Sequence, residues 1–349
     1  MTQSRLDLAF PDGHPGGEVL VIGARAADPL TSLDPARTRI LQGHFPDHQG
    51  LSERGWRVDP AIEGDFDLVL LFLPRAKAAA RAAIADAARR LQPGAALWID
   101  GQKTDGVDSI LRELRALAPV DEVHSKAHGK IFRVTMPEGD WLPKGWAAAG
   151  SEVAPGFITG PGVFSADGID PGSALLAAHL PERMPTRVVD LGAGWGWLSA
   201  QVLARPGLEQ LHLVEADHAS LELARRNLDD PRLSFHWADA RDFRLSDPVN
   251  GVVMNAPFHE GRQPDPKLGA AFIATAARLL TGAGRLWMVA NRHLPYETVL
   301  AQHFGQVHEI GGDNRFKVIE ATAAGKGQAG KGQAGKPSNS AKPALRRRR

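Results

Sequence analysis

The residues best suited to chemistry in this sequence are the four at 255–258, Asn-Ala-Pro-Phe, which directly follow an apolar stretch. The amide oxygen of Asn255 and the carbonyl of Ala256 could accept the two protons of an aromatic amine, which would turn the nitrogen lone pair toward an electrophile. Pro257 would fix the turn, and Phe258 would offer a stacking surface for an extruded base, worth about 1–3 kcal/mol. The pattern therefore indicates transfer to the exocyclic amine of a nucleic-acid base, with these four as the catalytic residues.

A glycine-rich segment, Leu-Gly-Ala-Gly-Trp-Gly, follows Asp190 and indicates the source of the transferred group. Glycines let a backbone adopt positive φ and approach a bound nucleoside closely. Gly192, Gly194 and Gly196 are spaced G-x-G-x-G, whereas a dinucleotide-binding loop needs G-x-G-x-x-G, and the next residue is Trp197. With Asp190 expected to face the amino-acid end of the cofactor, the spacing favours S-adenosylmethionine over NAD. A purely structural glycine turn is the alternative.

Three further positions complete the expected cofactor site. Glu215 ends the second expected strand, about 20 residues beyond the glycine loop, where a carboxylate can accept hydrogen bonds from ribose hydroxyls. Asp217 is an alternative for this role. Asp239, followed by Ala240, comes after the third expected strand and could accept a hydrogen bond from the adenine amine. Because the sulfonium of S-adenosylmethionine already activates the methyl group, no metal site is expected.

A doubly wound α/β domain is expected to position these residues, because strands and helices alternate through the C-terminal half. The expected strands span residues 187–190, 211–215, 233–237, 251–254 and 284–290, with a closing hairpin at 307–310 and 316–321. The expected helices span residues 197–204, 220–228 and 268–280. The glycine loop then follows the first strand, and Asn255 follows the fourth.

The N-terminal half repeats this order. Residues 87–99 and 276–288 align without a gap as a helix end, a turn and a strand, with Trp98 and Trp287 at the same place. An internal duplication explains the match, although any two α/β domains share such patterns. The first loop of the N-terminal copy keeps only Gly23, so its backbone cannot approach a cofactor closely. This copy is therefore expected to be catalytically dead.

The sequence thus predicts an α/β fold of two tandem Rossmann-like class I methyltransferase domains, of which the N-terminal copy is degenerate. The expected boundaries are 1–137 for the degenerate domain, 138–161 for a linker, 162–323 for the catalytic domain and 324–349 for a basic tail. The chain of 349 residues is 43% hydrophobic and 23% charged, which suits two globular domains.

Composition also narrows the compartment and the chemistry. The absence of cysteine excludes disulfides and any methyl transfer through a cysteine adduct, and it fits the reducing cytoplasm. The longest strongly apolar run, residues 68–73, is too short to cross a bilayer, and residues 1–11 contain no signal-peptide core. We therefore expect a soluble, cytoplasmic, monomeric protein without a membrane anchor.

The formal net charge of +1 hides an uneven distribution. Residues 324–349 hold four lysines, four arginines and no acidic residue, which leaves 33 basic against 40 acidic residues, a net charge of −7, for the remainder. The tail is rich in Gly, Ala and Lys, so we expect it to be disordered. It could tether nucleic acid electrostatically, or it could serve only solubility.

Several motifs extend over nearly the whole chain. They are GVFSADGIDPGS (162–173), the glycine loop, NAPFHEG, ANRHLPYE and RFKV in the C-terminal half, and PRAK, DGQKTDGVDS (100–109) and KAHGKIFRV in the N-terminal half. Together they resemble the tandem-domain bacterial ribosomal RNA guanine exocyclic-amine methyltransferases, most closely the small-subunit (16S) methyltransferase C family. The resemblance implies S-adenosylmethionine as cofactor, a guanine in ribosomal RNA as target, and ribosomal RNA or a ribosomal subunit as partner.

The resemblance also implies that Phe164 lines the cofactor and substrate cleft, and that the N-terminal copy aids RNA binding or folding. The family pattern at the catalytic turn is Asn-Pro-Pro-Phe, and Ala256 replaces the first proline. The replacement keeps the backbone carbonyl but reduces the rigidity of the turn.

Two other functions fit the same residues. The Asn-X-Pro-aromatic turn also serves methyltransferases that act on an adenine amine or on a protein glutamine amide. A non-catalytic RNA-binding ribosome assembly factor could use the cofactor loop only to sense S-adenosylmethionine. Incorporation of labelled methyl groups into RNA would distinguish an RNA methyltransferase from the non-catalytic factor.

Removing the tail from Ala324 onward is expected to weaken RNA binding at low salt and to leave cofactor binding intact. The remainder of the chain is acidic, so the eight tail charges would neutralise several phosphates and steepen the salt dependence of binding. The measurement is RNA affinity at a series of salt concentrations for the full and shortened chains. An identical salt slope for both would show that the tail has no electrostatic role.

Overall fold

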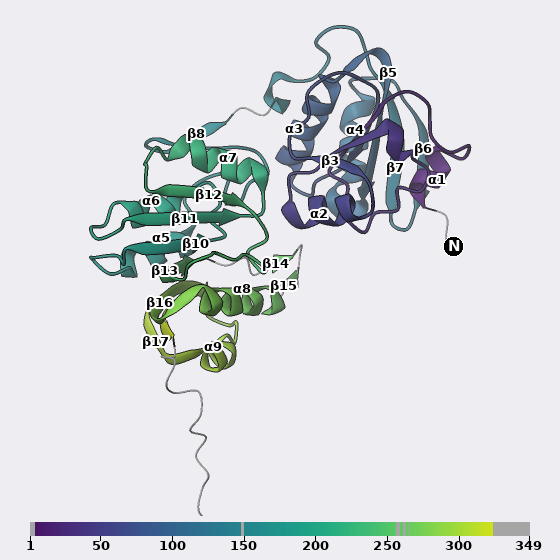
Figure 1. Cartoon of the computed structure of the whole chain (residues 1–349). Helices are drawn as coiled ribbons and strands as arrows, with labels where there is room; N and C mark the ends of the chain where they lie inside the picture. The colour runs from purple at the N-terminus through teal and green to yellow at the C-terminus, as the bar shows by residue number, and fades with distance from the viewer. Residues whose placement is uncertain (1–3, 148–149, 256–258, 261–262, 265, 324–349) are drawn as a thin grey trace, which may run out of the picture.

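The structure is a computed structural model, and it describes residues 4–147, 150–255, 259–260, 263–264 and 266–323. Within these residues the chain forms two α/β domains, seen at the upper right and the lower left of Figure 1. Each domain is built on a seven-stranded sheet. The predicted tail lies outside the described residues. No helix in the described part of the chain is long and apolar enough to cross a membrane.

The N-terminal domain places helices on both faces of its sheet. Its strands are β1 (Val19–Ile22), β2 (Thr38–Leu41), β3 (Arg57–Asp59), β4 (Phe66–Phe72), β5 (Leu91–Gln102), β6 (Val120–Lys126) and β7 (Gly129–Thr135). Its helices are α1 (Arg5–Ala9), α2 (Phe45–Glu53), α3 (Lys77–Ala88) and α4 (Val107–Arg115), with short 3₁₀ turns at Pro35–Arg37 and Lys103–Asp105. Apolar residues of α1 and α2 pack on one face of the sheet, and those of α3 and α4 pack on the other.

The C-terminal domain has the same organisation. Its main strands are β10 (Arg187–Leu191), β11 (Gln210–Glu215), β12 (Leu233–Trp237), β13 (Val249–Met254), β16 (Leu280–Asn291), β17 (Phe304–Gly312) and β18 (Phe316–Ala323), and β14 (His259–Glu260) pairs with β15 (Gln263–Pro264). Its helices are α5 (Pro171–His179), α6 (Trp197–Leu203), α7 (His218–Asn227), α8 (Pro266–Leu279) and α9 (Glu297–His303). One core joins α5, α6 and α7 to the sheet, and another lies on the opposite face beneath α8 and α9.

Both sheets have the same strand order, which confirms the predicted tandem fold. The orders are β3-β2-β1-β4-β5-β7-β6 and β12-β11-β10-β13-β16-β18-β17, and in each the last two strands form an antiparallel hairpin. All the strands and helices expected in the C-terminal half are present. The sequence patterns missed α5 and α9, because each is too short to give a clear helical period.

Strand register allows the two copies to be compared residue by residue. Trp98 pairs with Leu70, and Trp287 pairs with Val253. The two matching tryptophans therefore serve as the reference for aligning the two sheets. Following the pairing across each sheet then gives three equivalent pairs of positions. They are Val21 and Asp190, Gln42 and Glu215, and Phe72 and Asn255. The N-terminal copy therefore has no acid at the positions of Asp190 and Glu215 and no amide at the position of Asn255.

The segment between the domains is structured at both ends. Trp146 is buried in the core of the N-terminal domain, beside a 3₁₀ turn at Lys144–Trp146. Farther along, β8 (Ser151–Ala154) and β9 (Phe157–Thr159) form an antiparallel pair. The Asn227 side chain of α7 bonds the backbone N–H and carbonyl of Ile158 at 2.9 and 3.0 Å. Parts of the segment predicted as a linker thus pack on each domain.

The two domains meet through equivalent loops. The Phe45 N–H donates to the Ala216 carbonyl at 2.8 Å, and the His218 N–H donates to the Gly43 carbonyl at 2.9 Å. The Trp237 indole N–H donates to the Gly43 carbonyl at 3.0 Å and to the Ala216 carbonyl at 2.9 Å. Three rings also contact the Trp237 ring edge to face, with centroids 4.9–5.3 Å apart. They belong to Phe45, His48 and His218.

Trp237→Ala is expected to uncouple the domains. The substitution removes both indole hydrogen bonds and the ring contacts, and a Trp→Ala change of this kind costs roughly 3 kcal/mol. Calorimetric unfolding should separate into two transitions. Trp141→Ala is the control, because Trp141 packs against the core of the N-terminal domain. This substitution should lower the stability of that domain without uncoupling the two domains. A single transition at the wild-type temperature for Trp237→Ala would contradict the expectation.

Candidate active site

A cleft at the carboxyl edge of the C-terminal sheet brings together four of the predicted residues. Gly192, Gly194, Phe164 and Asn255 all line it. The glycine loop follows β10 and Asn255 follows β13, and these strands are neighbours in the sheet. The remaining wall comes from the chain before and at the start of α5 and from the tryptophans of the loop, and consists of Ser165, Asp170, Ser173, Ala193, Trp195, Trp197 and Leu198.

The three glycines of the loop have different tasks. All have positive φ, at 78° for Gly192, 56° for Gly194 and 90° for Gly196. A Cβ on Gly194 would meet nothing within 4 Å, so this backbone is open to a ligand. A Cβ on Gly196 would lie 2.8 Å from Leu228 and 3.2 Å from Ala224, which makes this glycine a packing position between α6 and α7. The structure therefore places only the first two glycines at the cleft.

Glu215 is held by backbone donors at the end of β11. Its Oε2 accepts from the Gly194 N–H and its Oε1 from the Asp217 N–H, both at 2.8 Å. Burial raises the pKa of Glu215 above its ordinary value. Asp217, the alternative for the ribose, instead caps α7, and its carboxylate accepts from the N–H and hydroxyl of Ser220 at 2.7 Å. Glu215 is thus the carboxylate better placed beside the glycine loop.

Asp190 lies beneath the loop and is completely buried. Its Oδ2 accepts from the Ser199 hydroxyl at 2.7 Å, whereas its Oδ1 has no hydrogen-bond partner among the described residues. Burial, together with repulsion from Glu215, raises the pKa of Asp190 to about 7. An unpartnered buried acceptor of this kind suits a cationic group such as an ammonium.

Asp239 and Ala240 lie farther from the cleft, near the domain contact. The Asp239 carboxylate accepts from the Arg241 side chain at 2.6–3.0 Å and from its backbone N–H at 2.8 Å. Against the effect of burial, these bonds hold the pKa of Asp239 below its ordinary value. Ala240 is buried in the core. Neither residue lines the cleft that contains Asn255.

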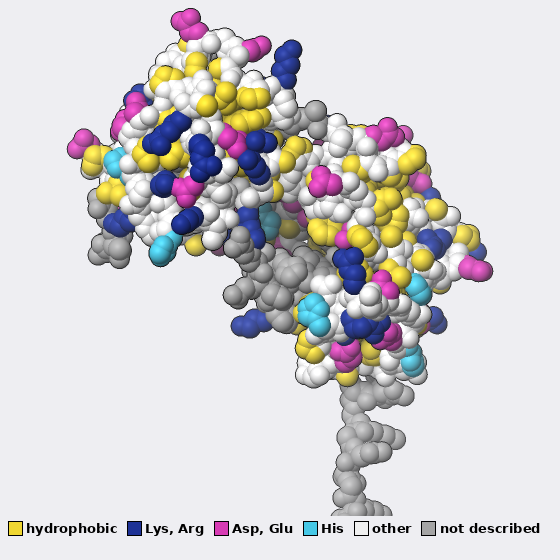
Figure 2. Space-filling model, turned by 180° about the vertical axis from the view of Figure 1, so that it is seen from behind, with side chains coloured by type: hydrophobic (Ala, Val, Ile, Leu, Met, Phe, Trp, Pro, Cys, Tyr) yellow, Lys and Arg dark blue, Asp and Glu magenta, His cyan; other side chains and the backbone are white. Residues whose placement is uncertain are grey.

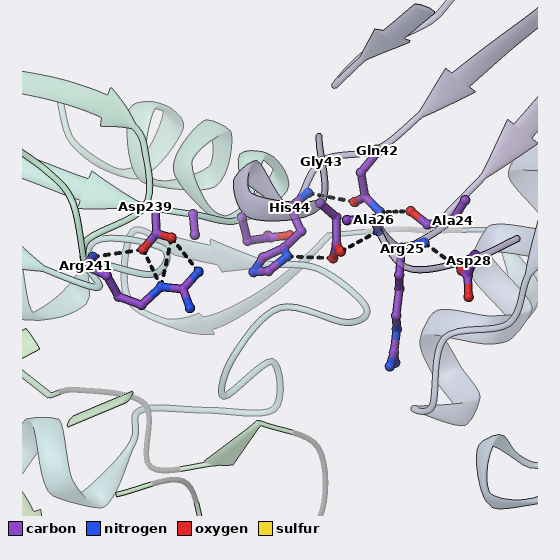
Figure 3. A network of polar contacts seen from close by, with 12 residues as sticks. Ala24, Arg25, Ala26, Asp28, Gln42, Gly43, His44, Asp239 and Arg241 are labelled. Carbon is purple, nitrogen blue, oxygen red and sulfur yellow. Dashed lines mark hydrogen bonds and ion pairs between the residues drawn. The ribbon is translucent and has the colours of Figure 1, made fainter. Parts of the chain in front are cut away.

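His44 from the N-terminal domain points toward this part of the site (Figure 3). Its Nδ1 lies 2.9 Å from Asp47 Oδ2, and this contact, with the charges of Asp47, Asp217 and Asp239, raises the pKa of His44. Sequence analysis did not single out His44, because its place follows from the packing of two domains. The only sequence signal is its position two residues after Gln42, the counterpart of Glu215.

Asn255 stands at the end of β13 with its amide nitrogen engaged. The Nδ2 group donates to Asp170 Oδ2 at 2.7 Å and to the Ser173 hydroxyl at 2.8 Å. The other predicted catalytic residues, Ala256, Pro257 and Phe258, lie outside the described residues. Sequence analysis did not single out Asp170 or Ser173 as site residues, because they are more than 80 positions from Asn255 in the chain.

Phe164 is the most exposed large apolar side chain at the site. Its side chain is 61% exposed, and its carbonyl accepts from the Trp195 indole N–H at 3.0 Å. The following residue, Ser165, has φ of 52°, which turns the chain back toward α5. An exposed aromatic ring at the rim of a polar cleft is suited to contact a planar ligand.

Asp190→Asn tests the energetic cost of the buried carboxylate. Because the folded-state pKa is raised, the contribution of Asp190 to stability is present below about pH 4 and is lost as pH rises through about 7. The asparagine variant does not ionise, so its advantage in unfolding free energy should grow between these values to at most about 4 kcal/mol. Chemical denaturation of the ligand-free protein across this pH range measures the difference.

Asp230→Asn provides the control for that experiment. Hydrogen bonds from Arg232 lower the pKa of Asp230 to about 2. Its stabilising effect is present above the unfolded pKa and is lost only in acid, so the trend with pH has the opposite sign. A pH-independent difference between wild type and Asp190→Asn would contradict the assignment.

Comparison with known proteins agrees with this geometry. The family model of the Methyltransferase small domain matches residues 155–320, and that of the Methyltransferase small domain N-terminal matches residues 12–139. The ribosomal RNA small subunit methyltransferase C of Hahella chejuensis is 30% identical over 276 residues, covering 75% of this chain and 80% of the relative. The protein of that name from Stutzerimonas stutzeri is 28% identical over 321 residues, covering 88% and 95%.

A solved structure extends the likeness to three dimensions. The T. thermophilus 16S rRNA N2 methyltransferase, solved in complex with AdoMet and guanosine, matches with a TM-score of 0.74 and 26% identity over 91% of each chain. The match therefore includes both domains. Together with the sequence relatives, it shows that the chain belongs to the ribosomal RNA small subunit methyltransferase C family.

Proposed function

We propose that this protein transfers a methyl group from S-adenosylmethionine to the exocyclic amine of a guanine in small-subunit ribosomal RNA. The observation that carries the proposal is the cleft in which the Asn255 amide and the open backbone of Gly194 share one wall. Membership in the ribosomal RNA small subunit methyltransferase C family supports it. The T. thermophilus relative, solved with AdoMet and guanosine, supports guanine as the target base.

The residues around the glycine loop fit the cofactor. S-adenosylmethionine, when bound, supplies a methyl group activated on a sulfonium. The free Oδ1 of Asp190 would receive the ammonium of its amino-acid end, and Glu215, already fixed by two N–H groups, would accept from the ribose hydroxyls. Asp239 and the backbone of Ala240 would serve the adenine. Phe164 would cover the sulfonium and the target base at the rim of the cleft.

Asn255 would act on the target amine. Its oxygen accepts one amine proton, which draws the nitrogen lone pair out of the ring and aims it at the methyl carbon. The N–C bond forms as the C–S bond breaks, and the methylated nitrogen releases its extra proton to solvent. Positioning alone can supply about 7–11 kcal/mol of the barrier reduction. The carbonyl of Ala256, the turn at Pro257 and stacking on Phe258 remain proposals based on the sequence.

The remaining expectations follow from this activity. The substrate is ribosomal RNA, free or within a ribosomal subunit, so the protein would work in the cytoplasm. Lysine and arginine side chains gather on the face of the N-terminal domain shown in Figure 2, where they could attract phosphate. We expect the protein to act as a monomer. Methylation of an adenine or a glutamine amide would instead give no labelled N2-methylguanine.

Asn255→Ala is expected to reduce methyl transfer about 10²- to 10³-fold, as loss of a preorganised polar group does, while cofactor affinity is retained. The reason is that Asn255 acts on the amine, whereas the glycine loop and Glu215 hold the cofactor. Methyl incorporation into unmodified small-subunit RNA and calorimetric cofactor binding are the two measurements. Asn250→Ala is the matched control, because Asn250 bonds Thr186 outside the cleft. Near-normal turnover by Asn255→Ala would place the chemistry elsewhere in the chain.

A further inference from the structure

The start of helix α5 makes an unusual connection to the end of β13. Asp170 is the N-cap of α5, and its Oδ2 accepts from the Ser173 N–H at 2.7 Å. The same oxygen accepts from the Asn255 Nδ2 at 2.7 Å, and the Ser173 hydroxyl lies 2.8 Å from that nitrogen. Both hydrogens of the amide nitrogen therefore have acceptors in the first turn of one helix.

This arrangement permits only one orientation of the Asn255 amide. An ionised carboxylate accepts hydrogen bonds and donates none. Turning the amide over would bring its oxygen to within 2.7 Å of the Asp170 carboxylate, where two acceptors repel each other. With the nitrogen fixed toward α5, the amide oxygen is left for the cleft, and it has no hydrogen-bond partner among the described residues.

We propose that Asp170, assisted by Ser173, is a positioning residue that fixes the Asn255 amide with its oxygen toward the target, so that the site selects bases that present an N–H donor. The proposal rests on the proposed role of Asn255. It assigns a task to the Asp-Pro-Gly-Ser segment at 170–173, which the cofactor and the target otherwise leave unexplained.

Gly172 provides the space that this contact needs. A Cβ at Gly172 would lie 3.0 Å from Asp170 Oδ2 and 3.6 Å from Asn255 Nδ2. It would also lie 3.4 Å from the Phe316 ring, so Asp170 would have to move to relieve the contact. The backbone of α5 can approach β13 this closely because the second position of the helix has no side chain.

The degenerate copy has lost both partners of this contact. Helix α1 precedes β1 and packs on β7, as α5 precedes β10 and packs on β18. The N-cap of α1 is Ser4, which forms a capping box with Asp7, and Phe72 occupies the position of Asn255. A carboxylate at the N-cap position is thus present in the copy that keeps the amide and is replaced by a serine in the copy that lacks it.

Asp170→Asn separates orientation from helix capping. Asparagine caps helices as well as aspartate does, so α5 should remain intact. An amide at position 170 can donate as well as accept, and it therefore allows the Asn255 amide to adopt both orientations. We expect kcat to fall about 10- to 100-fold, with cofactor affinity and melting temperature unchanged. Ser173→Ala removes one of the two acceptors and should give a smaller loss of kcat.

A matched control and a reciprocal exchange complete the test. Asp34→Asn changes another N-cap aspartate, one that bonds Ala36 in the N-terminal domain, and should leave kcat unchanged. The double variant Asp170→Asn/Asn255→Asp exchanges donor and acceptor across the same contact. Its kcat should exceed that of Asn255→Asp alone, in which two carboxylates face each other.

The outcomes distinguish this inference from the proposed function. Near-normal turnover by Asn255→Ala would overturn the proposed function and the inference together. If Asn255→Ala is inactive but Asp170→Asn retains kcat to within about twofold, only the inference fails. It also fails if Asp170→Asn loses cofactor affinity or melting temperature in step with kcat, or if the exchange variant is no better than Asn255→Asp.

Discussion

The half-buried carboxylate of Glu215 is the contact on which the cofactor edge of the catalytic domain depends. One oxygen binds the Gly194 N–H and the other binds the Asp217 N–H. The first bond ties the glycine loop to the end of β11, and the second fixes the residue that caps α7. Between them, Ala216 offers its carbonyl to Phe45 of the other domain. The Glu215 side chain therefore fixes the position of the glycine loop, of the start of α7 and of the backbone that contacts the other domain.

Burying the carboxylates of Asp190 and Glu215 lowers the free energy of unfolding at neutral pH. Burial raises the pKa of both Asp190 and Glu215, because a carboxylate taken out of water loses hydration that its hydrogen bonds do not fully replace. The corresponding residues of the N-terminal copy, Val21 and Gln42, bury no charge. At these two pairs of positions only the C-terminal copy carries acids, and we propose that a bound cofactor offsets their cost, as in the usual trade between stability and function.

Much of the fold could be predicted from the sequence, because it depends on local patterns. Apolar runs of strand length and the glycine spacing G-x-G-x-G place β10, β11 and β13 and the loop between the first two. The separate task of Gly196 could not be predicted, since it depends on the approach of α7. The capping of α7 by Asp217, the alternative to Glu215, could not be predicted either, because the start of that helix was expected at residue 220.

The support of Asn255 is the part of the site that the sequence conceals. Its partner Asp170 lies 85 positions away and belongs to a helix too short to give a periodic signal. A capping aspartate also has an adequate local explanation, so nothing in the pattern points to a second role. Trp237 is similar, because a tryptophan at the end of a strand is ordinary until another domain is packed against it. Contacts between distant segments carry this information, and local propensity does not.

The domain contact itself joins equivalent positions of the two copies. By strand register Gly43 corresponds to Ala216 and Phe45 to His218, and the two hydrogen bonds run from Phe45 to Ala216 and from His218 to Gly43. The two hydrogen bonds are thus the same bond repeated with the roles of the two copies exchanged, which is the pattern of a two-fold symmetric dimer. A fused pair of identical subunits explains this pattern. In that interpretation one copy could lose its acids and its amide without loss of these two hydrogen bonds, because both bonds join backbone groups only.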